Sequence, residues 1–123
     1  MPKKILVADD DTSILDAIKI ILEDEGYIVE TTPDGAEVFQ LSINEKPDVV
    51  LLDIWMSGVD GSEICKFLKN NSQTQNIPVI MISASTEIEQ LTKHCHADDF
   101  IMKPFDIDEL VNKVKKYCAD KNN

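Results

Sequence analysis

Four short apolar runs in this chain each stop at a polar residue, and this pattern is the strongest constraint on its fold. The runs cover residues 5–8, 49–52, 79–82 and 100–102, and the polar residues that follow are Asp9 with Asp10, Asp53, Ser83 and Lys103. Continuously apolar runs of this length are typical of parallel strands that are covered on both faces. If the runs form one parallel sheet, all five polar residues lie at the same edge of it.

The chain alternates between such runs and longer amphipathic segments. We predict strands near residues 4–9, 27–31, 48–53, 77–83 and 99–103, and helices near 12–25, 35–45, 61–70, 86–94 and 107–119. Five βα units with right-handed crossovers predict an α/β fold of the flavodoxin-like, doubly wound (βα)5 type, a three-layer sandwich whose parallel sheet has the order 2-1-3-4-5. Its switch point, where such folds bind ligands, lies between the strands that end at Asp10 and Asp53.

The helix boundaries carry capping signals. Three pairs have the spacing of a capping box, namely Asp34 with Glu37, Thr86 with Glu89 and Asp106 with Glu109. Asp11, or Thr12 in its place, is suited to cap the first helix, and Gly26 is suited to follow its end. The helix near 86–94 has only Ile88 and Leu91 as firm apolar anchors, so we expect it to be the most loosely held.

Composition narrows the functions that the chain can have. The length of 123 residues fits a single domain, 1–123, with residues 120–123 as a polar tail. A net charge of −11 argues against direct nucleic-acid binding. No apolar stretch approaches the ~20 residues of a membrane span, and the N-terminal run is too short for a signal peptide, which predicts a cytoplasmic protein. Cys65, Cys95 and Cys118 are widely spaced, which favours reduced thiols over disulfides.

The acids at the strand ends predict a cation site. The run 9–11 alone is equally typical of a solvated turn before a helix. Asp53, at the end of the neighbouring strand, changes this reading, because two unit charges 4 Å apart repel by about 4 kcal/mol at an effective dielectric constant near 20. A divalent cation would offset this repulsion, and carboxylate oxygens suit Mg²⁺, or Mn²⁺ in its place.

Ser83 and Lys103 carry little information separately. A serine after a strand is usually a turn residue, and a lone lysine is usually a surface residue. Lys103-Pro104 is more informative, because an X-Pro bond is where a cis peptide occurs. Together with the three acids, the hydroxyl and the amine predict a site for a divalent cation and a phosphoryl group.

These motifs resemble those of the receiver domains of two-component response regulators, along essentially the whole chain. The matching segments are KILVADDD (4–11), VVLLD (49–53), VDG (59–61), IPVIMISA (77–84) and ADDFIMKP (97–104). The resemblance is to stand-alone receivers of the chemotaxis and sporulation-relay kind. It implies a phosphorylation-activated signalling switch rather than an enzyme, with a sensor histidine kinase or a histidine phosphotransferase as phosphoryl donor.

The resemblance also implies a role for each site residue. Asp53 is expected to be the phosphoacceptor, Asp10 a direct Mg²⁺ ligand, Asp9 a ligand through water, and Trp55 a ligand through its backbone carbonyl. Ser83 is expected to bind the phosphoryl group, Lys103 to pair with it, and Phe100 to be the switch aromatic. A downstream protein is expected on the face formed by helix 86–94, strand 99–103 and helix 107–119.

The chain departs from the family pattern at three places. Met56-Ser57-Gly58 stands where the family commonly has Met-Pro, and His96 stands where it usually has glycine. The bulky Trp55 lies two residues after the acceptor, and we hypothesise that its indole screens the phosphoryl group from water; the alternative is a partly exposed packing residue. The cluster His94-Cys95-His96 invites a zinc site but lacks a second ligand pair, so favourable histidine charge at a helix C-terminus is the better interpretation.

Other functions share parts of this pattern. A dehalogenase-type phosphatase, a Mg²⁺-dependent enzyme that forms an aspartyl phosphate, needs a second acid two residues after the nucleophile, where this chain has Trp55. A flavodoxin needs a hydroxyl- and glycine-rich phosphate loop after the first strand, where this chain has three aspartates. A degenerate receiver used only for docking would not need Asp9, Asp10, Asp53, Ser83 and Lys103 together. The receiver of a longer DNA-binding regulator remains an open alternative.

Overall fold

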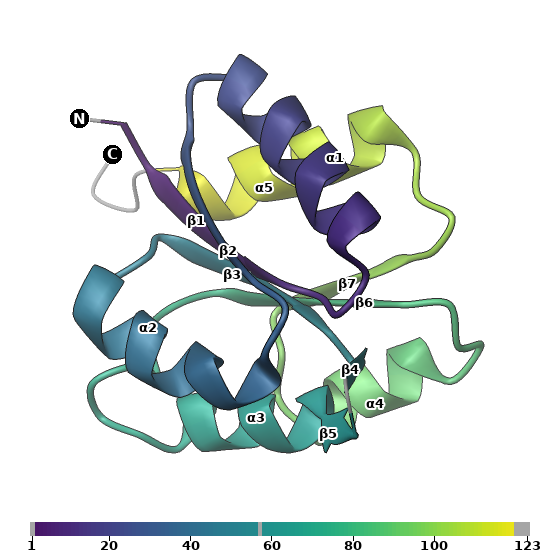
Figure 1. The fold of residues 1–123 in the computed structure, drawn as a ribbon. Coiled ribbons are helices and arrows are strands. Elements are labelled where there is room, and N and C mark those ends of the chain that lie inside the picture. Colours follow the sequence, from purple (N-terminus) through teal and green to yellow (C-terminus); the bar gives the residue numbers. More distant parts are fainter. Residues whose placement is uncertain (1, 57, 120–123) are drawn as a thin grey trace.

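The computed structural model describes residues 2–56 and 58–119, which form a five-stranded parallel sheet between two layers of helices (Figure 1). The strands are β1 (Lys4–Ala8), β2 (Ile28–Thr32), β3 (Val49–Asp53), β6 (Val79–Ser83) and β7 (Asp99–Met102). Their order is β2-β1-β3-β6-β7, with every neighbouring pair parallel. This confirms the predicted α/β fold and the order 2-1-3-4-5, with its switch point between β1 and β3.

Helices cover both faces of the sheet. They are α1 (Thr12–Asp24), α2 (Val38–Glu45), α3 (Gly61–Lys69), α4 (Ile88–His94) and α5 (Ile107–Cys118), with a 3₁₀ turn, η1 (Gly35–Glu37), before α2. Helices α1 and α5 lie on one face, and α2, α3 and α4 lie on the other (Figure 1). Among the described residues, no helix has both the length and the apolar character that a membrane crossing requires.

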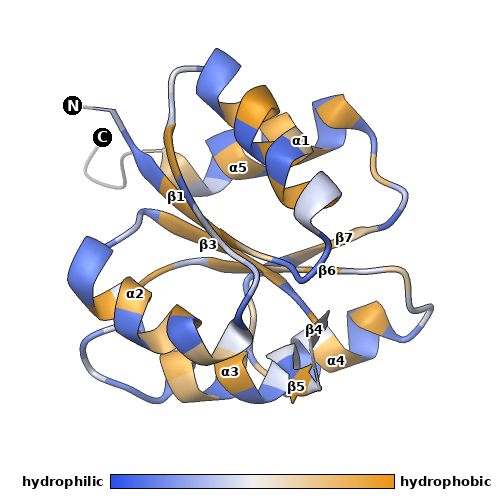
Figure 2. Ribbon diagram, viewed as in Figure 1, coloured by the Kyte–Doolittle hydropathy of each residue, from blue (hydrophilic) through white to orange (hydrophobic). Residues whose placement is uncertain are grey.

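The core is divided by the sheet because side chains along a strand alternate between its two faces. Ile5, Val7 and Leu51 pack toward α1 and α5, whereas Leu6 and Leu52 pack toward the other helix layer. Along each helix, hydrophobic residues alternate with hydrophilic ones (Figure 2), and buried apolar residues such as Leu15 and Ile18 of α1 belong to the core under the helix. The central strands are therefore apolar at consecutive positions, as the sequence predicted.

The helix ends agree only in part with the predicted caps. Asp11 accepts hydrogen bonds from the backbone N–H groups of Ser13 and Ile14, and so caps α1. Asp106 accepts one from the N–H of Asp108 at the start of α5. Gly26 follows α1 with a φ of 97°, a conformation that glycine adopts without strain.

Two predicted capping boxes are wrong in detail. α4 begins at Ile88 after Glu87, which makes no side-chain cap, and the hydroxyl of Ser85 rather than Thr86 accepts the N–H of Glu87. In η1 the Asp34 side chain accepts the N–H of Ala36, but Glu37 accepts a hydrogen bond from the Thr32 hydroxyl instead of turning back to Asp34. In both cases a nearby hydroxyl, that of Ser85 or of Thr32, forms a hydrogen bond that the capping box would have made.

The sequence did not predict a short hairpin after β3. Strands β4 (Trp55–Met56) and β5 (Val59–Asp60) pair antiparallel. The next residue, Gly61, begins α3 so close to β3 that a Cβ there would collide with the carbonyl oxygen of Asp53. Of the departures noted in the sequence, Ser57 lies outside the described residues, as does the predicted tail 120–123. The hairpin folds the chain back over the end of β3, next to the predicted site.

Candidate functional site

The carboxyl ends of the central strands bring three predicted acids together. One carboxylate oxygen from each of Asp9, Asp10 and Asp53 lies within 4.8 Å of the others. Asp9 and Asp53 are buried, with 0% and 6% of their surface exposed, whereas Asp10 is exposed. The sequence predicted this convergence from the parallel sheet alone, and the register of β1 on β3, which pairs Ala8 with Leu52, produces it.

Lys103 inserts its amine between the two buried acids. Its Nζ lies 2.8 Å from Oδ2 of Asp9 and 3.7 Å from Oδ2 of Asp53. The other oxygen of Asp9 accepts the backbone N–H of Asp11 at 2.9 Å, so the Asp9 carboxylate is held on both sides. The peptide bond between Lys103 and Pro104 is cis. The amine therefore balances part of the negative charge at the site and is closer to Asp9 than to Asp53.

The environment of Asp53 disfavours its charged form. Burial of its carboxyl and, second, the negative charge of Asp9 raise its pKa from 3.8 to about 6, although Lys103 and the backbone N–H of Trp55 act in the opposite direction. The pKa is raised because a carboxylate in this position has lost water and faces another carboxylate. A cation placed among the acids would favour the charged carboxylate and lower the pKa of Asp53.

The acid cluster has the donors that a hard divalent cation requires. It offers carboxylate oxygens from the ends of two neighbouring strands, and one of these carboxylates, Asp10, is exposed to incoming water and ligands. The residues His94-Cys95-His96, for which a zinc site was considered and set aside, do not converge on a common point. Cys95 is fully buried, His94 is exposed with its Nε2 3.0 Å from Nζ of Lys66, and His96 is exposed with a φ of 63°.

Ser83 and Phe100 lie on the two strands beyond β3. Ser83 ends β6, is 4% exposed, and its hydroxyl accepts the N–H of Ser85 at 3.0 Å. Phe100 lies in β7 and packs, half-buried, against the core that faces α4. Trp55 has 60% of its surface exposed, at the start of the hairpin that follows Asp53. The predicted site residues thus lie at or next to the carboxyl edge of the sheet, except Phe100, which pairs with Met81 in the middle of β6.

A polar network around Phe100 was not predicted from the sequence. Nζ of Lys113 in α5 lies 5.1 Å from the centroid of the Phe100 ring and donates to the Phe100 carbonyl at 2.6 Å and to Asp99 at 3.1 Å. The Tyr117 hydroxyl also donates to Asp99. The spacing 109, 113, 117 marks one face of a helix, but nothing in the sequence indicates that this face meets β7.

Known proteins resemble this chain along most of its length. Residues 5–115 match the model of the family described as response regulator receiver domain. The chain therefore belongs to the receiver-domain family of response regulators, whose members act in signalling. The dehalogenase-type phosphatase and the flavodoxin, which were alternatives for this fold, find no support in this match.

Two curated response regulators are similar to this chain in sequence. The chain is 37% identical over 117 residues to the DNA-binding dual master transcriptional regulator RpaA of Synechocystis sp., covering 94% of this chain and 48% of that protein. It is 33% identical to the response regulator MprA of Mycobacterium sp. (strain KMS), with 94% and 50% covered. The chain thus spans about half the length of these curated relatives.

Solved structures are similar over nearly the full length. A putative response regulator from Chloroflexus aurantiacus superposes with a TM-score of 0.92 at 28% identity, covering 98% of this chain and 100% of that one. A CheY-like response regulator receiver domain protein from Methanospirillum hungatei gives a TM-score of 0.87 at 33% identity, covering 96% and 94%.

Proposed function

We propose that the chain is a phosphorylation-activated switch that accepts a phosphoryl group on Asp53 from a sensor histidine kinase or a histidine phosphotransferase. The observation that carries this proposal is the placement of the Asp53 carboxyl at the end of β3, with two further acids within 4.8 Å and the Lys103 amine at 3.7 Å. Nucleophile, cation ligands and a counter-charge for phosphate oxygens therefore share one site.

In the proposed reaction a carboxylate oxygen of Asp53 attacks the phosphorus of a phosphohistidine. The P–N bond breaks as the P–O bond forms, and its electron pair leaves with the imidazole, which takes up a proton. Asp9, Asp10, Asp53 and the backbone carbonyl of Trp55 would hold Mg²⁺ or Mn²⁺, which when bound neutralises charge on the phosphoryl oxygens. Lys103 can shift from Asp9 toward a new phosphoryl oxygen, since its amine already lies between the two acids.

The output of the switch is proposed to run through Ser83 and Phe100. The Ser83 hydroxyl would turn from the N–H of Ser85 toward a phosphoryl oxygen and draw the loop before α4 with it. Phe100 would then rotate into the space that this loop leaves. The face formed by α4, β7 and α5 would change its shape and bind a downstream protein, as in other two-state elements that a local charge biases.

Two arrangements of the whole protein fit this function. A stand-alone domain, 1–123, in the cytoplasm would signal by protein contact and would not touch nucleic acid itself. Alternatively, the chain is the receiver of a longer DNA-binding regulator, which the partial coverage of its relatives favours. The size of the endogenous protein, measured with an antibody raised against this chain, separates the two.

The central proposal is tested by incubating the chain with Mg²⁺ and a small acyl phosphate, and then by intact-mass analysis. We expect one added phosphoryl group on wild type and on Asp16→Asn, a control that removes an exposed acid from α1. We expect none on Asp53→Asn. The proposal fails if wild type stays unmodified even with a histidine-kinase donor, or if Asp53→Asn is modified to the same extent.

A further inference from the structure

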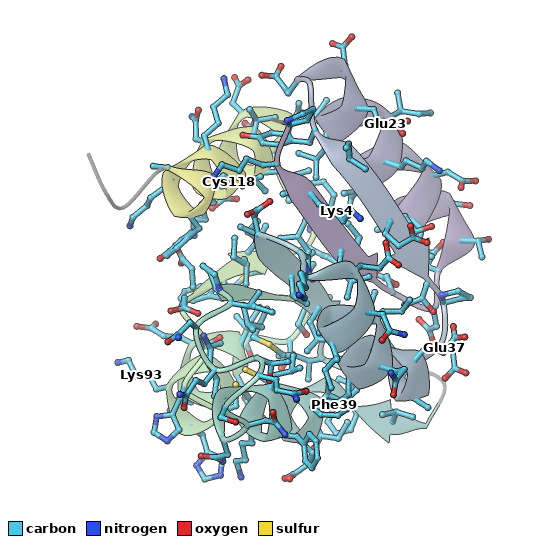
Figure 3. All side chains as sticks on the ribbon, turned by 90° about the vertical axis from the view of Figure 1, so that its left-hand side faces the viewer. Lys4, Glu23, Glu37, Phe39, Lys93 and Cys118 are labelled. Carbon is cyan, nitrogen blue, oxygen red and sulfur yellow. The ribbon has the colours of Figure 1, made fainter. Side chains whose placement is uncertain are left out.

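Two of the three thiols meet between α3 and the end of α4. Cys65 lies in α3, and Cys95 is the residue that ends α4; both side chains are completely buried. The Cys65 Sγ donates to the backbone carbonyl of Cys95 at 3.5 Å, and the Cys95 Sγ donates to the backbone carbonyl of Thr92 at 3.6 Å. The third thiol, Cys118, belongs to the core on the opposite face of the sheet. Figure 3 shows it on α5, well away from Lys93 of α4.

We propose that Cys65 and Cys95 form a reversible disulfide that ties the end of α4 to α3. Disulfides in a reducing compartment are mostly transient and redox-sensing, so two neighbouring thiols beside a short helix are a suitable site. The geometry of the bond needs the two sulfurs to approach to about 2.05 Å. The bond would cross-link two helices whose other contacts are side-chain packing and the polar contact between Nζ of Lys66 and Nε2 of His94 at 3.0 Å.

Cys95 is the thiol expected to react first. The adjacent Cys65 thiol lowers the pKa of Cys95 to about 7, although burial opposes this, and the positive charge of Lys66 adds to the effect. The adjacent Cys95 and, second, burial raise the pKa of Cys65. A thiolate is the reactive form, so this pair consists of an attacking and a resolving sulfur.

The oxidant reaches the pair when α4 opens. α4 has seven residues and no side-chain cap at its N-terminus. Its buried anchors are Ile88 and Thr92, and within the described part of the chain the Thr92 hydroxyl is a buried group without a hydrogen-bond partner. Leu91, a predicted anchor, is only half-buried. A short helix with one unsatisfied core residue opens locally at low cost, and its opening uncovers Cys95.

The reaction with a hydroperoxide such as hydrogen peroxide is balanced in two steps. The Cys95 thiolate attacks one peroxide oxygen, and the O–O bond breaks to give a sulfenic acid and, after protonation, water. The Cys65 thiol then attacks the sulfenic sulfur, forming the S–S bond and releasing a second water. The dithiol loses two electrons, and the peroxide gains them.

The disulfide is expected to hold α4 in its resting position, an effect that rests on the proposed function. Phosphorylation of Asp53 acts on the downstream face by moving the loop before α4 and the neighbouring Phe100. A covalent bond between α3 and the end of α4 opposes this movement. Oxidised protein would therefore accept the phosphoryl group without presenting the altered face.

The disulfide itself is tested by treating the full chain with hydrogen peroxide and measuring intact mass and cross-linked peptides. Cys118→Ser is the matched control, since it removes a buried thiol from the other core. We expect Cys118→Ser to lose two hydrogens and to yield a peptide pair joined at Cys65 and Cys95, reversibly with dithiothreitol. Cys65→Ser and Cys95→Ser should not lose them. The proposal is overturned if Cys118→Ser forms no such bond, or if Cys65→Ser loses two hydrogens equally well.

The restraint of α4 by the disulfide is tested by measuring hydrogen exchange in α4 and β7 of the Cys118→Ser variant. The reduced and the oxidised protein are each measured with and without a small acyl phosphate and Mg²⁺. We expect the acyl phosphate to change hydrogen exchange in α4 and β7 of the reduced protein but not of the oxidised protein. A change that persists after oxidation overturns the lock. The proposed function fails separately, if the reduced protein takes up no phosphoryl group.

Discussion

The variant Asp53→Asn is expected to be more stable than wild type when no metal is bound. Burial and the charge of Asp9 raise the pKa of Asp53 from 3.8 to about 6. At 1.36 kcal/mol per pKa unit, this difference corresponds to about 3 kcal/mol of cost for keeping the carboxylate charged in the folded state. Asparagine keeps the shape and carries no charge, so up to this amount should be recovered at pH 8. For a chain of 123 residues that is roughly 10 °C in Tm.

The raised pKa of Asp53 also predicts how the folding stability changes with pH. Between 3.8 and about 6 the folded state holds a proton on Asp53 that the unfolded state has lost. The stability of metal-free wild type should therefore fall as the pH rises through this window, and the Asp53 contribution should level off above it. Asp53→Asn should lack this part of the decline. Saturating Mg²⁺ should raise the Tm of wild type more than that of the variant, since the charged carboxylate is then a ligand.

The assay is thermal and urea unfolding in EDTA at several pH values, followed by circular dichroism. Asp16→Asn is the control, because it removes one negative charge from the exposed side of α1, and a change within about 0.5 kcal/mol is expected. The reasoning is refuted if Asp53→Asn is no more stable than Asp16→Asn at pH 8, or if its pH profile declines in parallel with that of wild type.

Other variants test the neighbouring contacts. Lys103→Met leaves the buried Asp9 unpaired and should cost about 3–5 kcal/mol in EDTA, with partial recovery in Mg²⁺; equal loss in both media would contradict the site. Trp55→Ala should shorten the lifetime of the acyl phosphate followed by intact mass, and an unchanged lifetime would refute screening by the indole. Thr92→Val removes a buried hydroxyl without a partner and should stabilise the fold by about 1–2 kcal/mol in urea unfolding. Burial raises the pKa of Asp99, but hydrogen bonds from the Phe100 N–H and from Lys113 outweigh burial and lower it. The contribution of Asp99 to folding stability is therefore lost as the pH falls. Lys113→Met should raise the pKa of Asp99 in a carboxyl NMR titration and weaken the loss of stability at acid pH.

Much of the fold follows from local pattern. The runs 5–8, 49–52 and 79–82 are apolar at every position, which is typical of strands covered on both faces, and the amphipathic segments between them supply the covering helices. The parallel sheet then places the residues after each strand on one edge. The pattern of apolar runs is therefore enough to assign Asp9, Asp53 and Lys103 to one site.

Details that depend on short polar side chains were predicted less well. The cap before α4 was assigned to Thr86, but Ser85 accepts the N–H of Glu87. Asp34 caps η1 as predicted, whereas Glu37, its expected capping-box partner, accepts from the Thr32 hydroxyl. The hairpin of β4 and β5 was missed because strands of two residues leave no periodic signal. These features involve free-energy differences of about 1 kcal/mol, which the pattern of a sequence does not resolve.

The sequence by itself determined the layers, the strand order and the set of residues at the carboxyl edge, because alternation and apolar runs act locally and the crossover rule does the rest. Only the tertiary structure decided that Lys103 lies closer to Asp9 than to Asp53, that Lys113 covers Phe100, and that Cys65 meets Cys95. The physical reason is that these contacts depend on how elements distant in the chain pack against each other, and no local periodicity encodes that packing.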